Sequence, residues 1–345
     1  MIHIDGTMGE GGGQVLRSSL TLSLITGRPV WFTRIRARRD RPGLGYQHRM
    51  AVHAAARIAG ARVEGARVGS QELEFVPDAV VPGEYHFDIG TAGSTSLVLQ
   101  TLLLPLALAP GASRIAVTGG THVPSSPCFH YLDWHWRVML ARLGIRFDLH
   151  MTRAGFYPPG GGEVLAAVPG NARIEGLDLR QRGRLVAVHG LSAVANLPLE
   201  IAERQRSQAM RRLSGLDCPL EIELENMPAH SPGTVLVLLA RFEHGQACFF
   251  ALGARGKRAE RVADEAVDAL HGLLAGEGAM DRWLADQLLL PLALADEPSV
   301  FSTSEVTLHL LTHADVIRAF LPVAIQIDGA MGEPGVVHVG PDKVA

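Results

Sequence analysis

Two kinds of landmark recur in this chain at almost the same spacing, and that internal repetition restricts the folds it can adopt. Gly27 and Gly111, each closing an apolar helical segment, lie 84 positions apart, and Arg57 and Arg142, in similar alanine-containing segments, lie 85 apart. A constant period is the signature of a repeated supersecondary unit. We therefore expect at least two copies of one α/β unit in the first half of the chain.

Each copy is predicted to run strand, helix, strand and helix, and the first to continue into a third strand. Helices are expected where apolar residues form a helical pattern that ends at glycine, and strands where short apolar runs alternate with polar residues. In the first copy these are strands at 2–4, 30–36 and 60–64 and helices at 15–25 and 47–59. In the second copy they are strands at 85–89 and 114–118 and helices at 97–108 and 131–143.

A third copy is predicted to be interrupted by an insertion. We expect it to open at 155–164, with strands reaching residue 179, and to resume with a helix at 285–295 whose sequence resembles that of 102–109. The opening phrase of the chain also returns in part at 327–335, which suggests the same repetition. The intervening segment has a different texture, with expected strands at 185–188, 220–224, 235–241 and 247–251 and helices at 199–213 and 259–274.

This organisation predicts an α/β (α+β) fold with two domains. Residues 1–182 and 276–345 would form a large domain of three repeats, and residues 183–275 would form a small inserted α/β domain. A chain of 345 residues is long enough for both.

The composition is that of an ordinary globular protein, with 47% hydrophobic and 19% charged residues. The net charge of −3 argues against a polyanion-binding surface over the whole molecule. The apolar run at 97–109 is interrupted by polar residues and a proline, so we expect no membrane span. Cys128, Cys218 and Cys248 form neither a metal-binding spacing nor a disulfide framework. We expect a soluble cytoplasmic protein.

A glycine-dense loop at 9–13 precedes the first helix, and Glu10, Gln14 and Arg17 lie in or just after it. The loop is not a Walker A motif, because no Gly-Lys-Ser/Thr follows, and it lacks the third glycine of the dinucleotide fingerprint. Glycines ahead of a helix N-terminus favour a phosphate ligand. A tight structural turn is the alternative interpretation.

Five arginines lie close together at 34–41. We expect Arg34, Arg36 and Arg38 to share one face of a strand, with Arg39 and Arg41 in the turn that follows. A solvated strand edge and a phosphate site, which the planar guanidinium fork suits, are both open from composition alone.

Several polar residues lie in segments that are otherwise apolar. His309 is flanked by apolar residues and threonines, and taken alone it is a structural histidine more often than a catalyst. Asp286 and Gln287 lie one turn after Trp283. Either Asp286 stabilises the N-terminus of a helix, or the acid, the amide and the aromatic ring together bind a purine. A buried Gln100 needs partners, so it is tied structurally or lines a site.

Taken together, these motifs resemble those of the RNA 3′-terminal phosphate cyclase family along the whole chain. The matching phrases, in family order, are Gly9-Glu10-Gly11-Gly12-Gly13-Gln14, Arg39 with Pro42-Gly43-Leu44 and Gln47-His48, Gly93-Ser94 with Leu99-Gln100-Thr101, Gly119-Gly120-Thr121, Gly155-Phe156-Tyr157-Pro158 with Gly160-Gly161-Gly162, Asp286-Gln287 and His309. The resemblance implies three repeats of a four-stranded sheet with two helices, plus a small inserted α/β domain.

The resemblance also implies a ligase reaction in which ATP drives cyclisation of an RNA 3′-phosphate to a 2′,3′-cyclic phosphodiester. His309 matches the nucleophile that takes AMP, and Glu10 would hold a divalent metal, Mg²⁺ or Mn²⁺. Four residues would hold phosphates of ATP or of the RNA end: Arg17, Arg36, Arg39 and Gln47. Five would line the adenosine side: Gln100, Pro127, Trp283, Asp286 and Gln287. Trp283 stands where the family often has tyrosine, and His313 and His122 also depart from its commoner residues.

Two other functions stay open from the sequence. One is a catalytically silent relative that binds RNA or takes part in ribosome assembly, although retention of His309, Glu10 and Arg39 argues against it. The other is an enolpyruvyl transferase, which uses similar repeats but needs no adenylated histidine.

Overall fold

The computed structural model describes residues 1–341, and within them three four-stranded sheets share one strand order. The first repeat consists of β1 (Ile2–Asp5), α1 (Gly13–Thr26), β2 (Val30–Thr33), α2 (Tyr46–Ala59), β3 (Arg62–Glu64) and β4 (Leu73–Val76). Its sheet has the order β1-β2-β4-β3, in which β1 and β2 are parallel and the other pairs are antiparallel.

The second repeat has the same plan. It consists of β5 (Glu84–Asp88), α3 (Thr95–Leu108), β6 (Ser113–Gly119), α4 (Phe129–Tyr131), η1 (Leu132–Trp136), α5 (Arg137–Arg142), β7 (Asp148–Arg153) and β8 (Gly162–Val168). The sheet order is β5-β6-β8-β7. The single helix expected at 131–143 is therefore one helical stretch with a π-helical turn in its middle.

The third repeat is completed from two distant parts of the chain. It consists of β9 (Asp178–Leu179), α8 (Arg282–Ala293), β14 (Ser299–Thr303), α9 (Leu308–Phe320), β15 (Val323–Asp328) and β16 (Gly335–Pro341). Its sheet, β15-β16-β14-β9, is the same order written in reverse. The predicted fold class, α/β (α+β) with repeated four-stranded sheets, is confirmed.

Two details of the predicted third copy were wrong. Residues 155–164 do not open it, because β8 pairs with β6 and β7 and so completes the second sheet. The phrase at 327–335 does not correspond to the opening of the chain either, since it forms the turn between the antiparallel strands β15 and β16. Sheet membership depends on pairing between distant segments, which local sequence similarity does not reveal.

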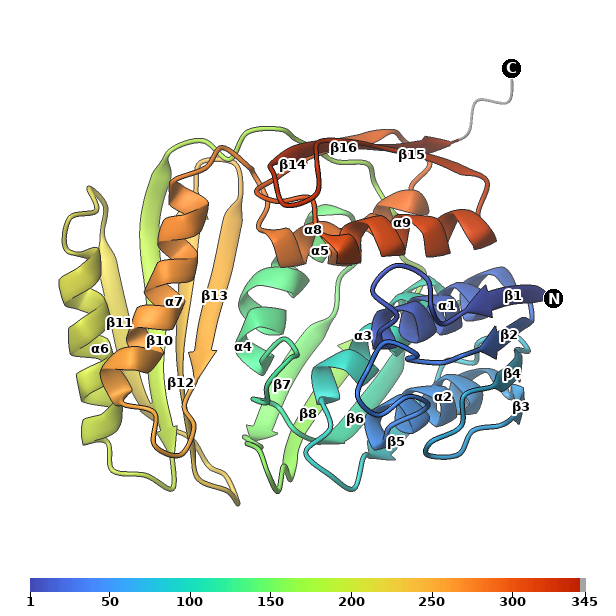
Figure 1. The fold of residues 1–345 in the computed structure, drawn as a ribbon, viewed down its shortest axis with the longest axis horizontal. Coiled ribbons are helices and arrows are strands. Elements are labelled where there is room, and N and C mark those ends of the chain that lie inside the picture. Colours follow the sequence, from blue (N-terminus) through green and yellow to red (C-terminus); the bar gives the residue numbers. More distant parts are fainter. Residues whose placement is uncertain (342–345) are drawn as a thin grey trace.

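A fourth sheet belongs to the segment between β9 and α8. Its elements are β10 (Leu185–Ala195), α6 (Glu200–Leu213), β11 (Leu220–Asn226), β12 (Gly233–Phe242), β13 (Gln246–Leu252) and α7 (Ala259–Leu274), and its strand order is β11-β10-β12-β13. Helices α6 and α7 pack on each other and on this sheet (Figure 1).

Strand β12 explains how this fourth sheet is held on both faces. Alternate side chains of a strand point to opposite faces. Val235, Val237 and Leu239 belong to the large core that the repeats share, whereas Leu236 and Leu238 pack in a separate cluster with residues of α6 and α7. The run is apolar throughout because both faces of the strand are buried.

The helices of the repeats lie together in the interior of the large unit (Figure 1), where α1 packs against α2, α3 and α9, and α9 packs against α8. Among residues 1–341, no helix combines the length and the apolar character that a bilayer crossing requires.

Candidate active site

The N-terminal ends of three helices supply the candidate site. Gln14 is the second residue of α1, Gln47 the second of α2 and His309 the second of α9. The residues that precede α1 and α2, Gly12 and Gly45, offer no side-chain cap to the first turn of either helix. Free backbone N–H groups and the positive end of the helix dipole make such ends suited to anions.

Helical spacing places the polar side chains of each helix on one of its faces. Residues three and four positions apart share one face of a helix. This spacing relates Gln14 to Arg17 on α1 and His309 to His313 on α9, and it relates Trp283 to the pair 286–287 on α8. The apolar remainder of each helix is buried in the shared core, so the polar faces meet where α1, α8 and α9 pack.

His309 is held through both of its ring nitrogens. Its Nε2 atom lies 2.6 Å from Oε2 of Glu10, and its Nδ1 atom lies 2.9 Å from Oε1 of Gln14. Gln14 in turn donates from Nε2 to Oδ2 of Asp286 at 3.0 Å. That donation fixes the amide so that its oxygen faces the imidazole, and His309 Nδ1 must therefore carry a proton to donate. The side chain of His309 is 48% exposed, so a substrate can reach it.

The contact between Glu10 and His309 favours the charged form of both side chains. The hydrogen bond from His309 to Glu10 raises the pKa of the histidine above its usual value, against the effect of partial burial. Burial acts to raise the pKa of Glu10, but the hydrogen bond and charge of His309, together with the charge of Arg39, lower it overall. Glu10 is thus a carboxylate, and Arg39 Nη2 donates to its Oε1 atom at 2.7 Å.

Three other groups near His309 have pKa values displaced by burial. Burial raises the pKa of Asp286 to about 7, and it lowers that of Arg17 to about 10 against the charges of Asp286 and Glu10. Burial also lowers the pKa of His313 to about 4. The His313 Nδ1 atom lies 2.8 Å from the backbone carbonyl of Asp286, so this second histidine is neutral and tied to α8.

A cluster of cationic and amide groups lies beside the glycine loop. Burial and the charges of Arg17, Arg36 and Arg39 lower the pKa of His48 to about 3, which places these three guanidinium groups around one neutral imidazole. Burial likewise lowers the pKa of Arg36. The buried Nε2 of Gln47 has no hydrogen-bond partner within the residues described. Unpaired donors beside guanidinium groups are suited to binding phosphate oxygens.

The predicted strand face of arginines was wrong. Strand β2 ends at Thr33, and both Arg34 and Arg36 have left-handed backbone conformations, with φ of 53° and 54°. Their side chains take separate partners and do not share a strand face: Arg34 pairs with Asp5 at the end of β1, and Arg36 donates to the carbonyl of Gly43 at 2.8 Å. Arg38 donates to the carbonyl of Gly9 at 2.7 Å. The segment is a compact turn that packs against the glycine loop.

The glycine loop approaches α9 too closely for any larger residue at one position. Gly9 has a φ of 52°, and a Cβ atom there would lie 1.7 Å from Oγ1 of Thr312. That same hydroxyl accepts a hydrogen bond from the backbone N–H of Glu10 at 3.3 Å. The close approach sets the position of Glu10 relative to His309.

Residues assigned to the adenosine side do not form one connected set of contacts. Gln100 donates to Oε1 of Gln287 at 2.8 Å, and Gln287 donates to the Tyr131 hydroxyl at 3.4 Å. Trp283 is 41% exposed, and the Arg282 guanidinium lies 4.6 Å from the centroid of its ring. Pro127 lies in the loop before α4 and is half-buried.

Sequence reasoning assigned no role to four residues that complete these contacts: Gln14, His48, Tyr131 and Thr312. Gln14 stood out beside the glycine loop, and its position one turn before Arg17 was a usable signal. Tyr131 carried none, because its contact with Gln287 depends on the packing of separate repeats.

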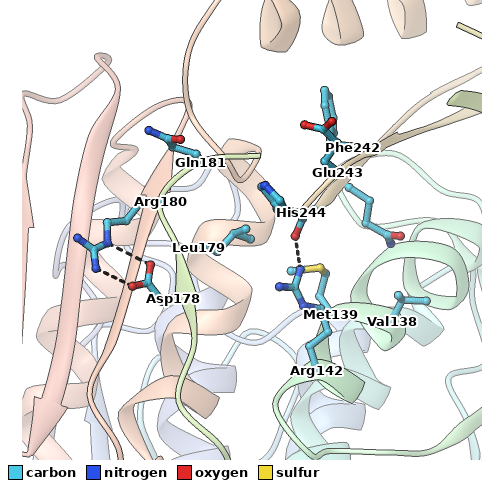
Figure 2. A pocket seen from close by; sticks show the side chains of 12 residues that line it. Val138, Met139, Arg142, Asp178, Leu179, Arg180, Gln181, Phe242, Glu243 and His244 are labelled. Carbon is cyan, nitrogen blue, oxygen red and sulfur yellow. Dashed lines mark hydrogen bonds and ion pairs between the residues drawn. The ribbon is translucent and has the colours of Figure 1, made fainter. Parts of the chain in front are cut away.

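A pocket of about 850 Å³ lies apart from these residues, between α5, β9 and the turn that joins β12 to β13. Arg180 donates from Nη2 to Oδ2 of Asp178 at 2.6 Å and from Nε to Oδ1 at 3.0 Å (Figure 2). Arg142 donates to the carbonyl of His244 at 2.7 Å. Both arginines therefore have partners within the protein, and none of the candidate site residues lines this pocket.

The fold and site define an α/β protein of three repeats, in which a histidine, a carboxylate and several arginines meet at helix N-termini suited to phosphate. The chain belongs to the RNA 3′-terminal phosphate cyclase family, whose sequence profile matches residues 8–327. It is 45% identical to the RNA 3′-terminal phosphate cyclase of Methylococcus capsulatus, over 98% of this chain and 96% of that protein. It is 42% identical to the one of Methanopyrus kandleri, over 99% of both chains.

Among solved structures, the enolpyruvyl transferase NikO from Streptomyces tendae aligns with 98% of this chain and 65% of its own, at 11% identity. The TM-score is 0.26, which is too low to indicate a common fold.

Proposed function

We propose that this protein is an ATP-dependent RNA 3′-terminal phosphate cyclase, a ligase acting in RNA processing, and that His309 carries AMP during its reaction. Family membership supports the activity. The observation that carries the mechanism is the fixed orientation of His309, with Nδ1 facing Gln14 and Nε2 directed at Glu10. A nucleophile oriented through its other ring nitrogen is the arrangement that covalent catalysis requires.

In the proposed first step, Nε2 of His309 forms a bond with the α-phosphorus of ATP as the bond to pyrophosphate breaks. Nε2 needs its lone pair for this step, so the proton that it shares with Glu10 must first pass to solvent. Nδ1 keeps its proton, because the Gln14 oxygen accepts a hydrogen bond from it. AMP then passes to an oxygen of the RNA 3′-phosphate as its bond to Nε2 breaks. The neighbouring 2′-hydroxyl attacks the phosphorus of the RNA 3′-phosphate and loses its proton to solvent, AMP leaves, and the 2′,3′-cyclic phosphodiester remains.

Glu10 would hold the divalent metal, Mg²⁺ or Mn²⁺, through carboxylate oxygens. The lowered pKa of Glu10 fits this role, because a hard cation requires an ionised oxygen ligand, and Mg²⁺ is commonly bound by one or two carboxylates together with substrate phosphates. When bound, the ion would neutralise charge on the phosphates. Arg17, Arg36, Arg39 and Gln47 would bind phosphate oxygens, and the unpartnered Nε2 of Gln47 supports this.

The adenosine side is proposed to include the amides of Gln100 and Gln287, which are hydrogen-bonded to each other and half-buried, with Pro127 and Asp286. Trp283 would stack on the base. We also propose that residues 183–275 form an inserted domain within a large domain of 1–182 and 276–345, because α6 and α7 have their own apolar cluster on the fourth sheet. The free thiols of Cys128, Cys218 and Cys248 are in keeping with a cytoplasmic location.

Incubation with ATP labelled at the α-phosphate tests the mechanism. We expect metal-dependent label on the wild-type protein, none on His309→Ala, and normal labelling of His150→Ala, whose histidine is exposed on β7. Label that persists in His309→Ala and maps to His313 or His122 would show that the nucleophile is misassigned. A wild-type protein that takes no label would favour a catalytically silent binding protein or an enolpyruvyl transferase. Conversion of RNA ending in a 3′-phosphate to a cyclic end then tests the activity itself.

A further inference from the structure

Three potential metal ligands lie together at a place that the proposed reaction does not use. One ligand atom each from His122, Cys128 and His130 lies within 4.8 Å of the other two. His122 follows β6, Cys128 is the residue that precedes α4, and His130 lies within that helix. All three residues are buried, with exposures of 1%, 0% and 6%. The cysteine spacing gave no sign of this cluster, because two of its three members are histidines.

The two imidazoles are already spaced as ligands of one ion. His122 Nε2 lies 3.1 Å from His130 Nδ1. Two nitrogens that each bind a tetrahedral Zn²⁺ at roughly 2.0–2.1 Å are separated by about 3.3 Å. The separation of the two nitrogens therefore has to change by only a few tenths of an ångström, while both rings turn so that their lone pairs face a shared ion. The Cys128 sulfur completes the set from the other end of the loop.

A hydrogen bond outside the cluster favours the metal-binding form of His122. Thr121 Oγ1 lies 2.8 Å from His122 Nδ1 and also accepts the backbone N–H of Gly155 at 2.9 Å. An outer hydrogen bond at Nδ1 sets the tautomer that leaves Nε2 free to bind a metal.

The thiol is the one member that must lose a proton. Burial raises the pKa of Cys128 to about 12, although hydrogen bonds from backbone N–H groups, Tyr131 among them, act in the opposite direction. A bound metal displaces the thiol proton, which passes to solvent, so affinity should rise with pH. Aromatic rings lie against the cluster. Phe156 stacks on His122 with 5.0 Å between the ring centroids, and Trp134 lies edge-on to His130 with 5.2 Å between the centroids. Such a shell limits water access and favours a closed site.

We propose that His122, Cys128 and His130 form a structural site for a thiophilic d¹⁰ cation, Zn²⁺ or Cu⁺. The donor set of two imidazoles and one thiolate suits these ions and not Mg²⁺ or Mn²⁺, which prefer oxygen ligands. Three protein ligands satisfy Cu⁺ with no net charge in the buried site, whereas Zn²⁺ requires a water as its fourth ligand. The ion would link His122 at one end of the loop that carries Pro127 to Cys128 and His130 at the other end.

Titration of metal-free protein with Co²⁺ tests the site, because a thiolate ligand produces a charge-transfer absorption in the near ultraviolet. We expect one equivalent to develop this band in the wild-type protein and Zn²⁺ to abolish it. Anaerobic competition against a chromophoric Cu⁺ chelator forms the second arm and decides which ion binds more tightly. Absence of a stoichiometric band together with absence of Cu⁺ competition in the wild-type protein would overturn the proposal, with no variant needed.

Variants identify the ligands. Cys128→Ser and His130→Gln should lose the band, with folding checked by circular dichroism, whereas Cys218→Ser, at a half-buried thiol elsewhere, should keep it. Thr121→Val should retain the band but weaken binding roughly 10- to 100-fold, since it removes only the outer partner of His122. A band that survives in folded Cys128→Ser and disappears in Cys248→Ser would assign the metal to a different thiol and refute this ligand set.

Discussion

The Nε2 atom of His309 lies 2.6 Å from Oε2 of Glu10, which joins the N-terminus of α9 to the glycine loop ahead of α1. With Gln14 accepting at Nδ1, both nitrogens of the imidazole act as donors, and this is possible only in the protonated ring. The nucleophile that we propose is therefore held in its unreactive form by the same carboxylate that is proposed to bind the metal.

The first prediction concerns this pair. Glu10→Gln should lower the pKa of His309, because the hydrogen bond and charge that favour the imidazolium are removed. Titration of the His309 resonances by NMR, assigned with His309→Ala, measures the change without any need for activity. Asp5→Asn provides the control, because Asp5 pairs with Arg34 and should leave the pKa of His309 as it is in the wild-type protein.

The same pair gives a pH dependence of stability whose sign follows from linkage. A raised pKa in the folded protein means that the folded state binds more protons, so the contribution of His309 is complete below about pH 6.5 and is lost as pH rises through its folded-state pKa. Chemical denaturation at a series of pH values above about 6.5 measures the free energy of unfolding. This free energy should fall less with rising pH in Glu10→Gln than in the wild-type protein. An equal dependence of the unfolding free energy on pH in the two proteins would contradict the ion pair between Glu10 and His309.

The second prediction concerns the N-terminus of α8. Asp281 Oδ1 accepts the backbone N–H groups of Trp283 and Leu284, both at 3.0 Å, and Oδ2 accepts from Nε2 of the buried His135 at 2.9 Å. Asp281→Ala removes a helix cap and leaves a buried donor unpaired, which should lower the free energy of unfolding by about 2–4 kcal/mol.

Urea denaturation checks this cost. Asp281→Asn keeps one acceptor oxygen and should lose less stability than the alanine variant. Asp315→Ala removes an exposed acid of α9 that pairs with Arg318, and its effect should stay within about 0.5 kcal/mol. A loss in Asp281→Ala no greater than in Asp315→Ala would mean that the buried network contributes little.

Local sequence patterns predicted most of the helices, because helix ends are set by nearby residues, but they did not predict α9. Gly27 and Gly60 end α1 and α2 in left-handed conformations, with φ of 66° and 58°, which glycine adopts readily. The turn at 34–39 was missed because its shape depends on distant partners. Its arginines adopt positive φ while their side chains bind Asp5 and the carbonyl of Gly43, and no local pattern indicates such contacts.

The site shows the same division between local and distant information. The sequence predicted that Asp286 and Gln287 open a helix one turn after Trp283, whereas α8 begins at Arg282 and both residues lie in its second turn. The resemblance to a family singled out His309. The link from His309 through Gln14 to Asp286 joins α9, α1 and α8, so it depends on how two repeats pack. Contacts of this kind follow from the tertiary structure and not from the spacing of residues within one segment.

The third prediction concerns Trp283. Its ring is 41% exposed, and if it stacks on adenine the stack should contribute roughly 1–3 kcal/mol, as base–aromatic stacking does in single-stranded nucleic-acid complexes. Trp283→Ala should therefore raise the ATP concentration for half-maximal labelling by roughly 5- to 150-fold. Trp283→Tyr keeps an aromatic face and should leave the ATP concentration for half-maximal labelling nearly unchanged. Trp31→Ala is a matched control, since Trp31 is also 41% exposed and lies on β2. An unchanged ATP requirement in Trp283→Ala would remove the residue from the nucleotide site.

The fourth prediction concerns Arg39. Its Nη2 atom donates at 2.7 Å to Oε1 of Glu10, while the other oxygen of that carboxylate faces the nucleophile. An arginine this close to the proposed point of AMP transfer should act in the labelling step. A hydrogen bond to a charged group contributes about 1.5–3 kcal/mol, so Arg39→Ala should label roughly 10- to 150-fold more slowly. Arg41→Ala, at an exposed position in the same segment, is the control.

A chase separates the two phosphates that Arg39 could serve. Protein loaded with AMP by long incubation is mixed with RNA ending in a 3′-phosphate, and loss of label is followed. Slow labelling with normal discharge would place Arg39 on the phosphates of ATP, as its contact with Glu10 leads us to expect. Normal labelling with slow discharge would place it on the RNA phosphate. Normal rates in both steps would leave Arg39 as a structural partner of Glu10, because a guanidinium that bound either phosphate would change one of the two rates.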